Sequence, residues 1–125
     1  MNRMELHDAY TILERNYRCQ ENSIIYDLHE NSQFSVQFFW EFYDSVMTLA
    51  QDALGKGANI QTAMKITFVY QQILKEMIFH FDEQDESRLK HFPRNYMEYI
   101  ERLDDGLSAY FRGVFIDEKL YSLKR

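Results

Sequence analysis

Hydrophobic residues recur at the three- and four-residue spacing of an α-helix along most of the chain. This spacing predicts helices over residues 3–19, 24–30, 35–54, 60–81 and 93–115. The last of these helices is expected to be weakened or bent at "DDG". The tail that follows it is expected to form at most a last turn. Four glycines and one proline leave few turn signals, so a β-sandwich is disfavoured. We therefore expect an all-α, compact bundle of four to six helices in a single domain, residues 1–125, with more than about 60 % helix and no sheet of three or more strands.

The segment 35–54 has the broadest apolar surface. Its polar residues gather on one narrow strip: Gln37, Glu41, Asp44, Thr48, Gln51 and Asp52. The remaining residues, from Val36 to Leu54, are mostly apolar, which is the pattern of a helix surrounded by other elements. We expect Phe39, Tyr43, Val46 and Ala50 at its buried centre and Trp40 at the edge of the core.

The two later helices also carry apolar faces. In 60–81 the expected buried residues are Ile60, Ala63, Met64, Thr67, Tyr70, Ile73, Leu74, Met77, Ile78 and Phe81, with Phe68 and Phe79 on the polar side. In 93–115 they are Ile100, Leu103, Leu107, Tyr110, Phe111 and Val114, and Gly106 is expected off that face. Pro93 suits a first helical turn, and Asn59 suits an N-cap.

Composition and charge narrow the function classes. The 125 residues are 46 % hydrophobic and 16 % aromatic, which is enough for a core, and the formal net charge is −6. That charge disfavours nucleic acid and anionic membranes as partners. Cys19 is alone, so no disulfide within the chain is expected. The charged N-terminal segment lacks the apolar stretch of a signal peptide, and we expect a cytoplasmic protein.

Motifs for catalysis or metal binding are not found in the sequence. The residues three before the histidines do not form the Glu-x-x-His pairs of a di-iron bundle. The segment from His80 to His91 is rich in acids but lacks the glycine and the final glutamate of an EF-hand. We therefore expect no enzyme activity, metal or cofactor, and a metal-dependent enzyme built on His80–His91 is the weakest alternative.

Two features favour a protein partner. The first is an acidic stripe, Glu98, Glu101 and Asp105, interrupted by Arg102 and Arg112 and preceded by Asp82, Glu83, Asp85 and Glu86. The second is a set of aromatic residues at the edge of the apolar faces or beside the stripe: Trp40, Tyr99, Phe68 and Phe79. Aromatic anchors surrounded by charge are typical of interface centres. The alternative is an ordinary solvated helix face with isolated exposed aromatics.

One stretch carries a family resemblance. In "ENSIIYDLHENSQFSVQFFWEFYDSVMTL", residues 21–49, an I-Y-x-L segment precedes a helix start from Phe39 to Ser45. It resembles helical immunity proteins of bacterial contact-dependent growth inhibition and related polymorphic toxin systems. The resemblance implies a protein that binds and neutralises a cognate basic toxin, often a nuclease, by covering its active site or substrate groove. The alternative is a small structural or regulatory helical module that self-associates through its aromatic patch.

Overall fold

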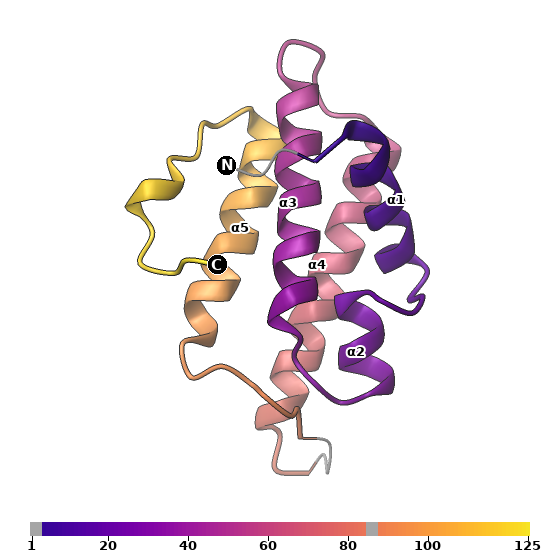
Figure 1. Ribbon diagram of the computed structural model, residues 1–125, viewed down its shortest axis with the longest axis vertical. Helices are drawn as coiled ribbons and strands as arrows, with labels where there is room; N and C mark the ends of the chain where they lie inside the picture. The colour runs from indigo at the N-terminus through magenta and orange to yellow at the C-terminus, as the bar shows by residue number, and fades with distance from the viewer. Residues whose placement is uncertain (1–3, 85–87) are drawn as a thin grey trace.

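The structure, a computed structural model, describes residues 4–84 and 88–125 and is all-helical in these ranges (Figure 1). Its helices are α1 (Leu6–Tyr17), α2 (Ile24–Glu30), α3 (Val36–Ala53), α4 (Ile60–Phe81) and α5 (Tyr96–Arg112), followed by a short 3₁₀ turn, η1 (Glu118–Leu120). Helices make up 66 % of the described residues, which contain no strand. The predicted fold class is confirmed.

The four long helices form a bundle in which α3 and α4 stand at opposite corners. Each of them packs against both α1 and α5, whereas α3 and α4 make little contact with each other. The short helix α2 packs against α1, α3 and α4 at one end of the bundle (Figure 1). The chain after α5 turns back and returns alongside that helix, so the C-terminus lies beside the middle of the bundle (Figure 1).

Helix boundaries follow from side-chain caps. The Ser35 hydroxyl accepts a hydrogen bond from the Phe38 backbone N–H and begins α3, and Asn59 accepts from Gln61 and Thr62 to begin α4. The N-cap prediction for Asn59 is therefore confirmed. Gly113, with φ of 67°, ends α5 in the left-handed conformation that glycine adopts without strain.

The face prediction for α3 is confirmed at its centre. Phe39 and Tyr43 are fully buried, Val46 is 1 % exposed and Ala50 is 6 % exposed. Phe39 packs edge-on to Tyr99 of α5, with ring centroids 4.8 Å apart. The prediction is wrong at both ends of the face: Val36, the first residue of α3, and Leu54, the residue after the helix, are exposed.

The face prediction for α4 is only half right. Ala63, Ile73 and Met77 are buried as expected, and Ile66 and Val69 are buried with them. Four residues assigned to the core are instead exposed: Ile60, Met64, Ile78 and Phe81. Because α4 carries apolar residues on two sides, helical spacing fits a buried face on either of them, and the spacing alone does not identify which side the bundle covers.

The α5 prediction needs two corrections. The helix is one continuous element, as expected, but it begins at Tyr96 and not in the turn at Pro93. Gly106 lies on its buried face, where a Cβ would sit 3.5 Å from Val46 and 3.8 Å from Tyr43 of α3. The side of α5 that carries Gly106 therefore faces α3, and Phe111 is exposed; Val114 is exposed beyond the end of the helix.

Candidate partner-binding surface

The outer side of α5 carries an acidic face, which we define as Glu98, Glu101 and Asp104. Glu101 and Asp104 are exposed and Glu98 is half-buried. Arg102, the basic residue that was expected to interrupt these negative charges, turns inward and is 2 % exposed. The outward surface of α5 from residue 98 to 105 therefore presents acids without a basic side chain among them.

Arg102 is instead the anchor of the C-terminal segment. Its guanidinium donates to the Tyr43 hydroxyl at 2.9 Å, to the Glu118 carboxylate at 3.0 Å and to the Leu123 carbonyl at 3.0 Å. It also lies 4.0 Å from the centre of the Tyr121 ring. Charged hydrogen bonds and cation–π contacts together bind the tail across α3 and α5.

A second arginine extends this anchor to α3. Arg125 pairs with the Asp44 carboxylate at 2.7 Å and lies 4.8 Å from the centre of the Trp40 ring. Burial raises the pKa of Asp44 to about 6, and Arg125 acts against this rise. The outer corner at α3 is thus covered by the last residues of the described chain.

The tail removes Asp105 from the exposed stripe predicted from the sequence. The Asp105 carboxylate accepts a hydrogen bond from the Tyr121 hydroxyl and is half-buried. Burial, and then this bond, raise the pKa of Tyr121. Asp105 therefore holds the tail, and Asp104 takes the third position on the outward acidic face.

Two of the aromatic residues expected at the interface are buried. Trp40 is 6 % exposed and lies under Arg102 and Arg125. Tyr99 is 7 % exposed and packs against Phe34 and Phe39 in the core. Neither side chain is open to a partner in this structure, because the tail covers the first and the core encloses the second.

The other two aromatic residues, Phe68 and Phe79, are 40 % and 43 % exposed. Both belong to a second surface, the outer face of α4, which we define as Ile60, Met64, Phe68, Gln71, Lys75, Ile78, Phe79 and Phe81. All eight residues are exposed. The aromatics predicted for an interface therefore lie on a different helix from the acidic face.

The acidic segment after α4 is a turn where the structure describes it. Asp82 accepts a hydrogen bond from the Gln84 backbone at 2.9 Å, and Glu83 is exposed. Asp85 and Glu86 lie outside the described residues. Among residues 4–84 and 88–125, no group of three or more His, Cys, Asp or Glu side chains could hold a metal ion.

His80, the histidine of the alternative metal site, has a structural role. Its Nδ1 accepts the Leu89 backbone N–H at 2.9 Å, and its ring stacks on Phe92 with centroids 4.2 Å apart. Burial lowers its pKa, so the neutral ring that accepts this bond is favoured. His80 thereby fixes the connection between α4 and α5.

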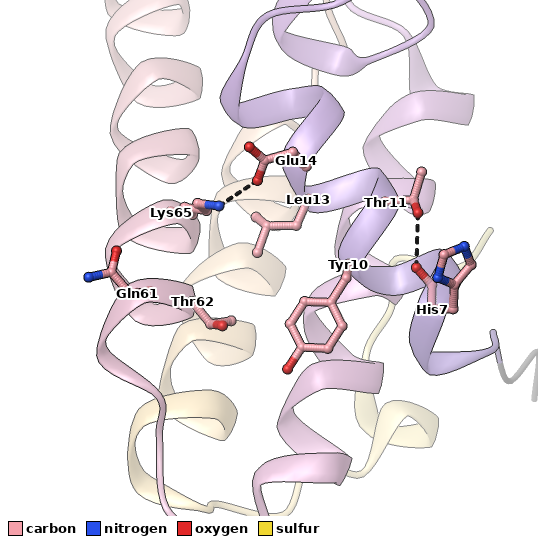
Figure 2. Close-up of a pocket in the computed structure, with 8 residues that line it drawn as sticks. All are labelled: His7, Tyr10, Thr11, Leu13, Glu14, Gln61, Thr62 and Lys65. Carbon is pink, nitrogen blue, oxygen red and sulfur yellow. Dashed lines mark hydrogen bonds and ion pairs between the residues drawn. The ribbon is translucent and has the colours of Figure 1, made fainter.

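A shallow hollow of about 380 Å³ lies between α1 and α4 (Figure 2). Its two charged side chains, Glu14 and Lys65, pair with each other at 2.5 Å. Hydrogen bonds from Lys65 and Arg18 lower the pKa of Glu14. His7 stands at the rim and is exposed, and the Thr11 hydroxyl is bonded to its backbone carbonyl (Figure 2). The charges in this hollow stabilise the α1–α4 contact and are not free to bind a ligand.

Comparison with family models, with curated proteins and with solved structures finds no match for this chain. No helix in the described part of the chain is long and apolar enough to cross a membrane. The candidate surfaces therefore rest on the chemistry of this chain alone.

The anchoring role of Arg102 was missed in the sequence, although a signal was present. Arg102 lies three residues after Tyr99 and four before Gly106, which places all three on one side of a helix. Tyr121 and Arg125 gave no comparable signal, because the tail that carries them has no regular period.

Proposed function

We propose that this protein is a non-enzymatic inhibitor, an immunity protein that binds a basic protein toxin through the acidic face of α5. The observation that carries the proposal is the inward turn of Arg102, which leaves Glu98, Glu101 and Asp104 as an outward acidic surface. The formal net charge of −6 supports the same class of partner.

The chemistry of the surface suits a toxin that acts on RNA or DNA. Nucleases present basic grooves to the phosphate backbone, and a row of carboxylates on an inhibitor can occupy such a groove. Opposite charges also accelerate the encounter of the two proteins. Two exposed apolar side chains of α5, Met97 and Phe111, supply surface for close contact beside the acids. The resemblance of residues 21–49 to helical immunity proteins supports the inhibitory role.

The proposal is tested with the protein encoded directly upstream, produced in bacteria with and without this chain. We expect the upstream protein alone to stop growth and the wild-type chain to restore it. Glu101→Lys should weaken protection, and the Glu98→Lys/Glu101→Lys variant should weaken it further, because both place positive charge against a basic partner. With purified proteins, wild-type association should slow as the salt concentration rises.

The matched control is Glu21→Lys, which makes the same charge change at an exposed position between α1 and α2. It should protect as well as the wild type. Equal protection by the double variant, at unchanged thermal stability, would remove the acidic face from the interface. An upstream protein that is harmless when produced alone would contradict the inhibitory role.

A further inference from the structure

We infer that the outer face of α4 is the docking surface for a second copy of this chain, with the two α4 helices antiparallel about a two-fold axis near Gln71. Helix α4 carries apolar side chains on two sides, beside a polar strip that includes Lys65, Gln72 and Glu76, and an apolar side of a helix is normally covered. Its inner side is covered by the bundle, whereas Ile60 is 81 % and Ile78 is 64 % exposed.

The uncovered area is close to what a stable dimer needs. Six apolar side chains of the face are between 40 % and 81 % exposed: Ile60, Met64, Phe68, Ile78, Phe79 and Phe81. A large aromatic side chain can bury about 150–250 Å² when it is fully covered. At the exposed fractions given above, the six side chains together offer on the order of 700 Å² per copy. A standard-size interface covers about 800 Å² on each partner.

The outer face of α4 carries little charge of its own, which suits a second copy of the same face. Lys75 is the one charged side chain among the eight residues of the face. Near the middle of the helix, Lys65 pairs with Glu14 at 2.5 Å and Glu76 is hydrogen-bonded to His29 at 3.2 Å. The exposed acids Asp82 and Glu83 lie beyond the end of the face. The middle of the face is therefore nearly neutral, and two such faces can meet there without repulsion despite the net charge of −6.

The order of apolar and polar residues on this face is similar in both directions along the helix. Ile60 and Met64 lie at one end and Ile78 and Phe81 at the other, with the polar Gln71 midway. An antiparallel pair thus brings apolar ends against apolar ends and Gln71 against Gln71, the self-complementary arrangement of a two-fold interface.

The single charge also fits this arrangement. Lys75 is four residues from the axis, so the two copies of it are about 12 Å apart along the helices and do not meet at the axis. Each Lys75 instead reaches the level of Phe68 of the second copy, where a cation–π contact is favourable.

This inference is independent of the proposed function. It uses α4, whereas toxin binding uses the outer side of α5, and each can fail while the other stands. A dimer would carry two acidic α5 faces, one on each copy.

The test is the mass in solution, by sedimentation equilibrium over a wide range of protein concentrations. We expect the wild-type mass to approach twice the chain mass of 15.2 kDa as the concentration rises. Gln71 is exposed in the single chain, so Gln71→Glu and Gln71→Lys should leave the fold intact. Each variant alone should dimerise at least about tenfold more weakly, because like charges meet at the axis. Mixing the two variants should restore a dimer that contains one copy of each.

The matched controls are Leu120→Glu and Leu120→Lys, at an 83 % exposed apolar position of the tail. They should dimerise like the wild type, alone or mixed. A wild-type chain that stays at 15.2 kDa at every concentration would overturn the inference. So would a dimer that both Gln71 variants leave unchanged, because its interface would then lie elsewhere.

Discussion

Helices α3 and α4 occupy opposite corners of the same bundle and are both rich in apolar residues, yet the outer sides of the two helices have different surroundings. The corner at α3 is covered by the C-terminal tail, whose Arg125 pairs with Asp44 and lies over Trp40. The corner at α4 is uncovered, with Met64 half exposed and Ile78 more so.

The difference shows that an apolar side chain does not by itself identify the core. Trp40 stands at the edge of the α3 apolar surface, and a segment distant in sequence buries it. Met64 stands on an equally apolar helix, and no described segment of the chain covers it. Within one copy, an apolar face is buried only where another segment packs on it. A face that lacks such a segment is open to a second copy of the chain.

The largest effect is expected where α3 is enclosed. Phe39→Ala should reduce the free energy of unfolding by about 3–5 kcal/mol, because it removes a fully buried ring and leaves a cavity. Met64→Ala on the outer face of α4 should cost less than about 1 kcal/mol in the monomer. Urea unfolding at a concentration too low for association measures both. Similar losses at the two positions would contradict the contrast between the corners.

The next effect concerns the cover of the α3 corner. Arg102→Met should lower stability by about 2–4 kcal/mol, because the Tyr43 hydroxyl and the Leu123 carbonyl lose a charged hydrogen bond, whereas Glu118 keeps Arg125 as a partner. Hydrogen exchange should then accelerate in the tail around Leu123. Arg112→Met is the matched control, an exposed arginine on the same helix, and should change stability by less than about 0.5 kcal/mol. A tail that remains protected in Arg102→Met would show that its apolar contacts suffice.

A smaller effect should appear as a pH dependence at the same corner. The pKa of Asp44 is about 6 in the folded protein and 3.8 when unperturbed, so the folded state binds this proton more tightly. Stability should therefore fall as pH rises from about 4 to about 6, by roughly 2–3 kcal/mol from this group.

Asp44→Asn cannot titrate and should remove this part of the decline. Thermal unfolding at a series of pH values compares it with the wild type and with Glu21→Gln, which neutralises an exposed carboxylate. Parallel wild-type and Asp44→Asn curves would show that burial does not perturb this carboxyl.

Local signals in the sequence predicted the helices well, because spacing and caps act over a few residues. Ser35 and Asn59 begin α3 and α4 by bonds to the next turn. The candidate surfaces depend on distant segments and were predicted less well. Asp105 and Arg102 were both placed on the surface, but a tail more than ten residues away binds them. Ile60 and Met64 were placed in the core, because periodicity does not distinguish the two apolar sides of α4.

The most direct test of the uncovered corner is a disulfide across the inferred two-fold axis. Gln71→Cys, made together with Cys19→Ser so that it is the sole cysteine, should form a covalent dimer rapidly under mild oxidation. The two thiols should lie within the distance that a disulfide spans. Leu120→Cys in the same background is the control, at a position that is also exposed but lies away from the face. We predict that Cys at position 71 cross-links at least about tenfold faster than Cys at position 120. Equal rates at the two positions would contradict the account of α4 as a surface that a second copy covers.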